Sequence, residues 1–465
     1  MAAKKYDVII VGAGPAGLFA ALEILKSGKA EVILVEKGKD IRERGCNLLN
    51  NGICTKCEIC DILCGVGGSG LFSDGKLNFS PIIGGNLYEF MGKEEAEELL
   101  EYIANMFREN GVEIKFKENG RIKELRKRAM KAGVTFIPIN QVHLGSENLP
   151  NFIESVENNI IRMNGKFLIN WEAIDVDPKE NKLRIRHRNE DREEREINYD
   201  YLLISPGRSG SDWLAQLCKK IGVETKFNPI DIGVRVETLS SVMEDVTSIN
   251  WDPKFHIRAP TYDDFVRTFC TNPNGYVMKE DYGEYVCVNG YSRKDKTSEN
   301  TNFALLVQLN LTKPLENTNE YGKSIAKLAT TIGGGKPLIQ RLADMRASRR
   351  STWERIRRSV VKPTLQDVTP GDISMALPHR IITDILEALD RLDKVIPGVA
   401  DDSTLLYAPE IKFYAMRVKT DRELRTNVDN IYVAGDGAGV SRGIIGACAT
   451  GLIAARSIVN RIKGG

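Results

Sequence analysis

The sequence is poor in features that would assign it to several classes of protein. No apolar run in it approaches the roughly 20 residues of a membrane-spanning helix. Lys and Arg number 65 and Asp and Glu 63, so the net charge of +2 gives no global case for a nucleic-acid-binding protein. Residues 1–5 lead straight into an apolar run and leave no room for a signal peptide. We therefore expect a cytoplasmic protein with reduced thiols.

The stretch from Tyr6 to Glu36 carries the strongest positive signal. Tyr6–Val11 is rich in β-branched residues, as in a strand buried on both faces, and the glycines of GAGPAG follow it directly. Such glycines permit a tight turn, close approach of a pyrophosphate and close helix packing, and an acid about 20 residues later binds a ribose hydroxyl. The pattern predicts a dinucleotide site made by Gly12, Gly14, Pro15, Ala16, Gly17, Glu36 and Lys37.

A second glycine-rich loop spans Gly65–Gly70 and continues to Ser73-Asp74-Gly75. Its many backbone N–H groups are free to line an anionic ligand. A flexible surface loop is the alternative interpretation. Because the loop follows the first pair of predicted strands, we expect it near the phosphates, with Gly67, Gly68, Ser69 and Gly70 as candidate contacts.

Five of the nine cysteines lie between Cys46 and Cys64. Cys54, Cys57, Cys60 and Cys64 have the spacing C-x2-C-x2-C-x3-C, which is typical of a 4Fe–4S cluster. Gly65 replaces the usual proline, and Cys46 is a spare ligand. Four thiolates also suit zinc, whose sites more often have two C-x2-C pairs on either side of a longer loop. Ordinary thiols with no metal are the third interpretation.

The rest of the chain shows two kinds of apolar pattern, one typical of helices and one typical of strands. Helical apolar spacing predicts helices at 93–110, 149–163, 322–330, 336–346 and 381–392. From about Asn228 the chain changes to short alternating strands, which predict a mostly antiparallel sheet inserted as a second domain. NIYVA at 430–434 returns to a buried strand, followed by a glycine loop and a final helix.

Three of these stretches together resemble the glutathione-reductase-type FAD superfamily: GAGPAG with Glu36, YLLISPG at 201–207, and NIYVAGDGAG at 430–439. The resemblance implies that Asp436 binds the ribityl or pyrophosphate part of FAD. It also implies that the final helix directs its positive N-terminus at the flavin, where it favours the anionic reduced form. It adds Gly207, Gly435, Asp436, Gly443 and Ile444 to the candidate contacts.

Further motifs are similar to those of a group of uncharacterised FAD-dependent dehydrogenases. They include GGSGLFSDGKL at 67–77, DIGVRVE at 231–237, GDISMALP at 371–378 and GDGAGVSRGIIGA at 435–447. The expected fold is α/β, with a discontinuous Rossmann-type FAD-binding domain at 1–227 and 396–465. A β-rich substrate domain is expected at 228–395, covering the flavin.

The sequence has no second G-x-G-x-x-G motif after a strand, so we expect no separate NAD(P)H domain and disfavour the pyridine nucleotide-disulphide reductases. FAD-dependent tRNA-modifying enzymes carry a further helical domain after the last helix. This sequence shows no such domain after its last predicted helix, so we also disfavour a modifier of RNA. The leading interpretation is an FAD-dependent oxidoreductase acting on an organic substrate or a ferredoxin-like carrier. The alternative is a flavin and iron–sulfur electron-transfer subunit of a larger complex, with no small substrate of its own.

Candidate catalytic residues are few. Lys76 and Asp74 lie beside the second glycine loop, where they could contact the flavin or the phosphates. His143 and His379 are two of only four histidines and are candidates for a general acid or base. A structural role is the alternative for each.

Arg341–Lys362 holds seven Arg and one Lys against Asp344 and Glu354, a local charge of +6. A solvated helix face is the ordinary explanation of such a run. Because Arg suits bidentate capture of carboxylate or phosphate, we expect Arg346, Arg349 and Arg350 to share one helical face and hold an anionic group.

Overall fold

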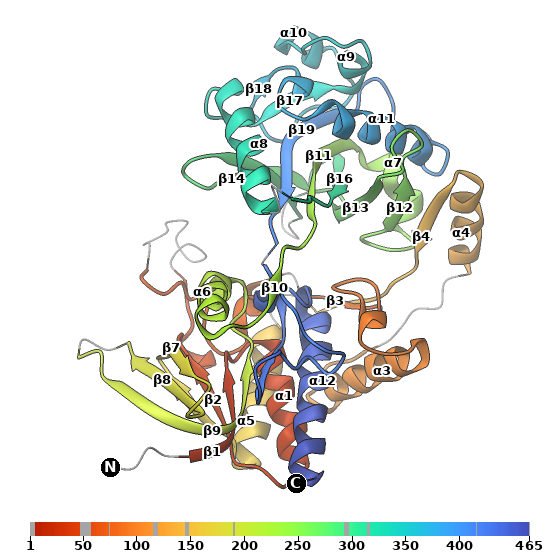
Figure 1. Ribbon diagram of the computed structural model, residues 1–465. Helices are drawn as coiled ribbons and strands as arrows, with labels where there is room; N and C mark the ends of the chain where they lie inside the picture. The colour runs from red at the N-terminus through yellow and green to blue at the C-terminus, as the bar shows by residue number, and fades with distance from the viewer. Residues whose placement is uncertain are drawn as a thin grey trace. The chain divides into compact units, whose positions relative to one another are not determined.

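The computed structural model describes residues 5–46, 57–73, 75–114, 120–144, 148–188, 191–292, 297–313, 317–414 and 416–464. The chain forms two compact units (Figure 1). Unit 1 comprises the described residues of Met1–Phe116, Asn140–Phe227 and Ala415–Gly465, and unit 2 those of Lys117–Ile139 and Asn228–Tyr414. The mixed α/β fold with a β-rich second part agrees with the fold class expected from the sequence.

A seven-stranded sheet forms the centre of unit 1. β1 (Lys5–Val11) pairs in parallel with β2 (Val32–Glu36) and β9 (Glu194–Ile204), β6 (Lys166–Ile169) extends the β2 edge, and β21 (Ile431–Val433) joins β9 in parallel. β7 (Trp171–Asp177) and β8 (Lys182–His187) form an antiparallel hairpin that continues from β9. The apolar runs of β1 and β2 are buried because helices cover this parallel part of the sheet.

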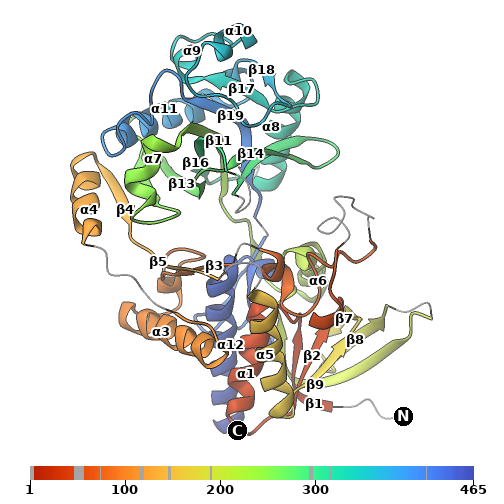
Figure 2. The ribbon, with the colours of Figure 1, turned by 180° about the vertical axis from the view of Figure 1, so that it is seen from behind.

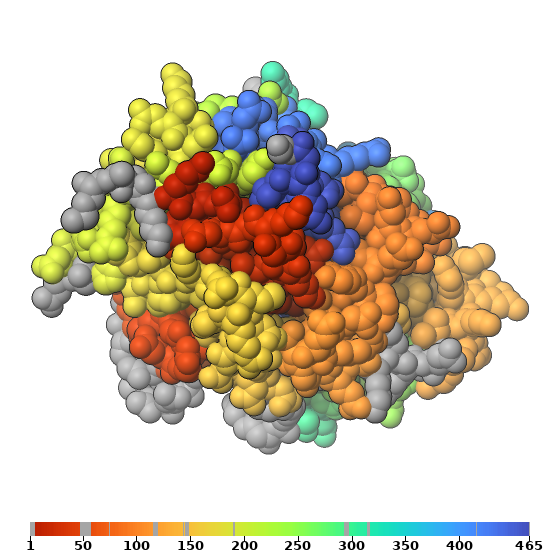
Figure 3. Space-filling view, turned by 90° about the horizontal axis from the view of Figure 1, so that it is seen from below, coloured from red at the N-terminus to blue at the C-terminus, as the bar shows by residue number. Residues whose placement is uncertain are grey.

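Four helices pack around the start of unit 1. α1 (Pro15–Lys26) lies against α12 (Gly443–Gly464) and α5 (Leu149–Arg162), and α3 (Lys93–Glu109) packs on α12 (Figure 2). Figure 3 shows the residues of α1 in red between those of α12 in blue, α3 in orange and α5 in yellow. A Cβ on Gly451 of α12 would lie 2.2 Å from the Ala16 carbonyl, so the contact between α1 and α12 requires glycine there.

Smaller elements complete unit 1. They are the helix α6 (Ser211–Ile221), the strand pairs β3 (Lys76–Phe79) with β5 (Asn140–His143) and β10 (Thr225–Lys226) with β20 (Arg417–Val418), and, among the described residues, five 3-10 turns: η1 (Ile41–Glu43), η2 (Gly68–Phe72), η3 (Leu87–Glu89), η4 (Arg208–Gly210) and η6 (Asp436–Ala438). The rings of Phe19, Phe79, Phe107 and Phe152 contact one another in the core. Aromatic packing thereby fixes α1, α3 and α5 beside β3.

Unit 2 is built on an eight-stranded, mostly antiparallel sheet. Its order is β18 (Thr369–Pro370), β17 (Leu338–Arg341), β19 (Leu405–Lys412), β11 (Ile230–Leu239), β16 (Asn300–Leu309), β13 (Phe265–Asn272), β12 (Lys254–Arg258) and β4 (Val134–Ile137). The apolar alternation of β11 faces one hydrophobic core, which it shares with α4 (Arg121–Lys131), α7 (Ser240–Thr247), α8 (Thr318–Ile332) and α11 (His379–Asp393). The hairpin of β14 (Tyr276–Asp281) and β15 (Val286–Tyr291) packs on other strands of the sheet.

The compact units differ from the predicted domains at two places. Residues 117–139 belong to unit 2, because β4 pairs with β12, and unit 2 extends past residue 395, because β19 is an interior strand beside β11. Pro409 lies within β19 and lacks an N–H, which hides the strand in the sequence. The structure places Pro409 next to a register shift in the pairing with β11, where a ladder hydrogen bond is not needed.

The predicted helix at 336–346 is wrong in its first half. Leu338–Arg341 is strand β17, and only α9 (Leu342–Arg346) is helical. A short apolar run fits either period, and here the pairing of β17 with β19 decides for the strand.

Among the described residues one helix, α12, is long and apolar enough to cross a membrane by length and composition. The expectation that no segment reaches this threshold is therefore wrong for α12. Burial inside the structure covers 72% of its most apolar window, as in a core helix.

Candidate cofactor pocket

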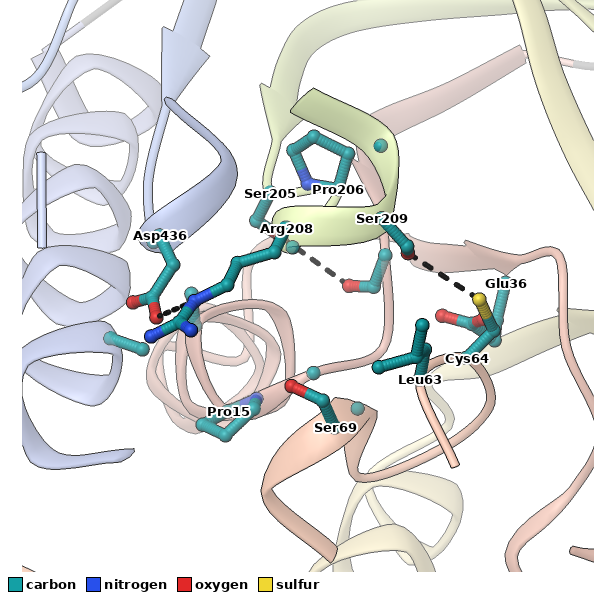
Figure 4. A pocket seen from close by; sticks show the side chains of 18 of the residues that line it. Pro15, Glu36, Leu63, Cys64, Ser69, Ser205, Pro206, Arg208, Ser209 and Asp436 are labelled. Atoms are coloured by element: carbon teal, nitrogen blue, oxygen red, sulfur yellow. Dashed lines mark hydrogen bonds and ion pairs between the residues drawn. The ribbon is translucent and has the colours of Figure 1, made fainter. Parts of the chain in front are cut away.

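A cavity of about 560 Å³ opens at the carboxyl ends of β1, β2 and β9 in unit 1 (Figure 4). This edge is where open α/β sheets bind ligands. Its walls include fourteen of the sixteen cofactor-binding candidates: Gly12, Gly14, Pro15, Ala16, Glu36, Lys37, Gly68, Ser69, Gly70, Gly207, Gly435, Asp436, Gly443 and Ile444. The other two, Gly17 and Gly67, do not line it.

The three glycines of GAGPAG have different physical roles. Gly12 has a φ of +97°, and a Cβ there would lie 2.3 Å from the Ser205 carbonyl oxygen. A Cβ on Gly17 would lie 2.0 Å from the Gly12 carbonyl oxygen, so Gly17 permits α1 to pack on the turn. A Cβ on Gly14 would meet only the Cα of Gly68, at 3.8 Å. No protein atom needs this space, which fits a bound pyrophosphate at the N-terminus of α1.

Glu36 joins three segments at the end of β2. Its carboxylate accepts hydrogen bonds of 2.9 Å from the backbone N–H groups of Ala13, Gly38 and Gly65, and its side chain is buried. The segments that surround the pocket at this end are therefore held by one acid. The carboxylate also lines the cavity, where its remaining lone pairs suit a ribose hydroxyl.

Arg44 organises the wall that contains Cys64, and no sequence motif pointed to this residue. Its guanidinium makes six hydrogen bonds of 2.7–3.4 Å, all to backbone carbonyls, which belong to Asp61, Ile62, Gly65, Val66 and Gly68. Burial lowers the pKa of Arg44 to about 10. Because these contacts span residues 61–68, Arg44 fixes the conformation of the loop that carries Leu63, Cys64 and Gly65 into the pocket.

The opposite end of the cavity is formed by residues near the chain's end. Asp436 accepts hydrogen bonds from the Ser441 hydroxyl at 3.3 Å and the Gly443 N–H at 3.2 Å. Arg208 reaches across from η4 and places its Nε 3.5 Å from the Asp436 carboxylate (Figure 4). Burial raises the pKa of Asp436 above its usual range, and the Arg208 charge opposes this effect.

Several wall residues were not predicted from the sequence. Trp171, Glu172 and Ala173 come from β7 and Trp213 from α6, while Arg208, Ser209 and Gly210 come from the turn after Pro206-Gly207. Gly207 has a φ of +62° with open space around its missing Cβ. The signal for this turn was available, since a Ser- and Gly-rich helix start follows β9 at the ligand-binding edge of the sheet.

The candidate catalytic residues are separated. Lys76 lines the cavity at the start of β3, and its backbone pairs with that of His143 on β5. Asp74 lies outside the described residues. His379 is an exposed residue at the start of α11 in unit 2 and does not line the cavity. Among the candidates whose side chains the structure describes, Lys76 lines the pocket and His379 does not.

The cysteines divide in the same way. Cys64 is buried in the pocket wall with its Sγ 3.4 Å from the Ser209 hydroxyl, and its N–H bonds the Cys60 carbonyl. Cys57 is exposed, and Cys54 lies outside the described residues. Within the ranges that the structure describes, no group of three or more His, Cys, Asp or Glu side chains is arranged to hold a metal ion.

The arginine-rich segment lies in unit 2, and the expectation of one shared helical face is wrong. α9 ends at Arg346, and α10 (Trp353–Arg357) begins only after a turn that contains Arg349 and Arg350. Arg349 donates to the buried Asp344 at 2.8 Å, and Arg346 to Asp390 at 2.6 Å. Much of the local charge is thus neutralised inside the chain.

Two family models match the chain. Residues 6–225 match pyridine nucleotide-disulphide oxidoreductase, and residues 229–412 match FAD-dependent protein, C-terminal domain-like. No curated protein sequence matches. Similar solved structures include E. coli quinol fumarate reductase FrdA (11% identity, TM-score 0.45, 100% of this chain and 72% of that chain covered) and 3-ketosteroid-delta4-(5alpha)-dehydrogenase from Rhodococcus jostii RHA1 (10%, 0.45, 98% and 97%). Another is glycine oxidase from Geobacillus kaustophilus (12%, 0.38, 98% and 95%).

The pocket and the family matches define an FAD-dependent oxidoreductase, an enzyme with FAD as its cofactor. Its residues 6–225 are similar to pyridine nucleotide-disulphide oxidoreductases, and its residues 229–412 to the C-terminal domain of FAD-dependent proteins. The match over residues 6–225 is to a family that the missing second glycine motif had disfavoured. The matches name no substrate.

Proposed function

We propose that this flavoprotein moves electrons between FAD bound in unit 1 and an organic substrate recognised by unit 2, as a member of the FAD-dependent dehydrogenase group. The observation that carries the proposal is the convergence of GAGPAG, Glu36 and GDGAG on one cavity, although the last motif lies some 400 residues from the first. Bound FAD supplies the redox chemistry, and the protein supplies binding and orientation.

The chain's own residues divide the work along the cavity. The free N–H groups at the start of α1 hold the pyrophosphate beside Gly14, and Glu36 holds the ribose. The start of α12 directs its positive end toward the flavin end, marked by Asp436, Gly443 and Ile444. Lys76 is a candidate catalytic residue that lines this cavity, so we assign it a contact with the flavin or a phosphate.

A second candidate function is an electron-transfer subunit that exchanges electrons with a ferredoxin-like carrier through a cluster on Cys54, Cys57, Cys60 and Cys64. The position of Cys64 in the pocket wall favours it, since a cluster there would lie next to the cofactor. A cytoplasmic location and the absence of nucleic-acid binding stay predictions of the sequence.

The proposal is tested by the cofactor itself. We expect denaturation of the purified protein to release FAD without covalent attachment, and Glu36→Ala to weaken FAD retention at least about tenfold, since it removes an acceptor shared by three segments. Glu31→Ala, at an exposed acid before β2, is the matched control and should retain FAD. Release of FMN, or of no flavin, would contradict the proposal.

A further inference from the structure

The sheet of unit 2 has one apolar face and one strongly polar face. On β11, Ile232, Val234 and Val236 face the core, whereas Asp231 and Arg235 alternate with them. The same face receives Arg267 and Phe269 from β13, Lys254 and His256 from β12, and Glu410 and Lys412 from β19, by strand alternation and register. A sheet buried on both sides rarely carries so many charges unless they bind something.

Three cations converge on the ring of Phe269. The Lys254 Nζ lies 5.0 Å from the ring centroid, the Arg267 Cζ 5.1 Å and the Lys412 Nζ 5.7 Å. Each distance falls within the range of a cation–π contact. One aromatic side chain thus brings three positive groups from three strands together, at the cost of their mutual repulsion.

Carboxylates balance these charges only in part. Asp252 bonds Lys254 at 2.5 Å, Asp231 pairs with Arg267, and Glu410 is shared by Lys412 at 2.8 Å and Arg235 at 3.1 Å. Four cations therefore meet three carboxylates in direct contact. The Nε of Arg267 is buried and has no hydrogen-bond partner within the described chain, and it is a donor that suits a further acceptor.

The histidine beside these groups adds no charge. His256 is paired across the strands with Arg267. Burial, together with the charges of Arg267 and Lys254, lowers the pKa of His256 to about 4. At neutral pH the imidazole is an uncharged donor and acceptor next to the cations.

Internal ion pairing alone explains the cluster poorly. Buried ion pairs are often no more stabilising than apolar residues of the same size. Arg267 and Lys412 expose 17% and 15% of their side-chain surface, whereas Arg235 and Glu410 expose 0%. Partly exposed cations on an otherwise buried polar framework are typical of a binding site for an anion.

We propose that the polar face around Phe269, with Arg267 and Lys412 as its cationic contacts, is a carboxylate-binding site that recognises an organic acid substrate. This inference rests on the proposed role of unit 2 in substrate recognition. The charge of the acid meets Arg267 and Lys412, and its carbon skeleton contacts Phe269. The enzyme is thereby assigned a substrate class: organic carboxylates rather than neutral compounds.

The test uses benzoate and its uncharged isostere benzamide, added to the FAD-loaded protein at ionic strength held constant with sodium chloride. Apparent dissociation constants follow from the rise in Tm with probe concentration. We expect benzoate to bind and benzamide to bind at least about tenfold more weakly. Lys412→Gln and Arg267→Gln should each weaken benzoate binding about tenfold, and Lys412→Gln should fold normally because Glu410 keeps Arg235.

Arg258→Gln is the matched control. Arg258 lies on the same strand as His256, is exposed and contacts the ring of Phe265 at 5.6 Å, so its loss should leave benzoate binding unchanged. Equal binding of benzoate and benzamide, or equal effects of the Lys412 and Arg258 variants, would overturn the inference. FAD absorbance is measured in every sample. If the carboxylate site is wrong, the protein still contains FAD; if the proposed function is wrong, the protein lacks FAD.

Discussion

At the scale of single residues, the guanidinium of Arg44 donates six hydrogen bonds, and all of them go to backbone carbonyls rather than to carboxylates. A planar group with five N–H donors can bind several carbonyls at once, whereas a lysine ammonium cannot span them. The cation also lies 5.0 Å from the ring of Phe72. The conformation of the pocket wall at 61–68 thus depends on the shape of one side chain as well as on its charge.

Arg44→Lys should therefore weaken FAD binding at least about tenfold and lower stability by about 2–3 kcal/mol, although the charge is kept. The matched control is Arg42→Lys, two residues earlier, because Arg42 is exposed and pairs with Asp40 at 2.9 Å. FAD titration by fluorescence and thermal unfolding measure the two effects. Equal FAD affinities in both variants would show that Arg44 does not position the wall.

Glu157 on α5 makes the stability of the fold depend on pH. Its carboxyl is 1% exposed, and its Oε2 has no hydrogen-bond partner in the described chain, with Arg42 Nη2 at 3.7 Å. Burial is the main cause that raises the pKa of Glu157 to about 7. The nearby charge of Asp40 also raises this pKa, whereas the charge of Arg42 lowers it. Glu154 adds a smaller effect in the same direction as Asp40. The folded state therefore binds the proton more tightly than the unfolded state.

Glu157 consequently stabilises the fold below its unfolded pKa, near 4.5, and this contribution is lost as pH rises toward 7. We expect Glu157→Gln to be more stable than the parent at pH 8 by about 1–3 kcal/mol and to have a flatter stability profile between pH 5 and 8. Urea unfolding across this range measures it. Glu154→Gln is the control, and a parallel shift of its profile by the same amount would contradict the assignment.

At the scale of elements, the segment from Cys57 to Cys64 carries three of the four candidate cluster ligands, and within the described residues no group of three such side chains is arranged to hold a metal ion. The fourth ligand candidate, Cys64, is buried toward the cofactor cavity, whereas Cys57 is exposed. If the four cysteines hold a cluster, anaerobically purified protein should contain about four iron and four sulfide per chain. Cys57→Ser should then remove the iron and leave FAD bound.

Cys218→Ser, at a buried thiol of α6 outside the segment, is the control for that experiment and should keep any iron. Iron-free protein made under anaerobic, iron-replete conditions would assign the cysteines as ordinary thiols.

The arginine-rich segment gives a second prediction for an element. Arg349 bonds Asp344, whose side chain is 0% exposed, while Arg350 is exposed and has no carboxylate partner in the part of the chain described. Arg349→Ala should cost about 1–3 kcal/mol because it removes a partner of a buried charge, and Arg350→Ala should stay within about 0.5 kcal/mol. Thermal unfolding distinguishes them.

Only Arg350 is then left to test the expected contact with an anionic partner. Its alanine variant should slow reduction by an acidic electron carrier, and association should fall steeply with salt. If turnover changes neither with the Arg350→Ala substitution nor with salt concentration, the segment is a solvated surface without a partner.

The parts of the pocket that are formed by short local motifs could be predicted from the sequence. The turn at Gly12–Gly17, the acid at Glu36 and the final GDGAG loop are recognisable because each needs fixed residue types at fixed spacing. Arg44 and Trp171 were missed, since their roles depend on which distant segments meet once the chain has folded. The domain boundary at 396 was missed for a related reason, because Pro409 conceals an interior strand.

At the scale of the whole molecule, unit 1 is assembled from three separated parts of the chain, one more than the discontinuous domain expected from the sequence. The part from residue 415 onward supplies a buried strand, β21, which pairs with β9, and a core helix, α12, to a unit whose other sheet strands lie before residue 228. Gly451 against Ala16 shows how closely the last helix must approach the first.

This arrangement sets an order in time. β9 ends at Ile204 and its neighbour β21 begins at Ile431, so the ribosome adds roughly 230 residues between them, which takes about 10–45 s at common rates of synthesis. Throughout that interval the nascent sheet has an open edge at Leu202–Ile204 of β9, and α1 lacks its contact with α12. Aggregation or chaperone binding during translation would therefore concentrate on these two surfaces, and FAD capture must wait until the GDGAG loop and α12 have been made.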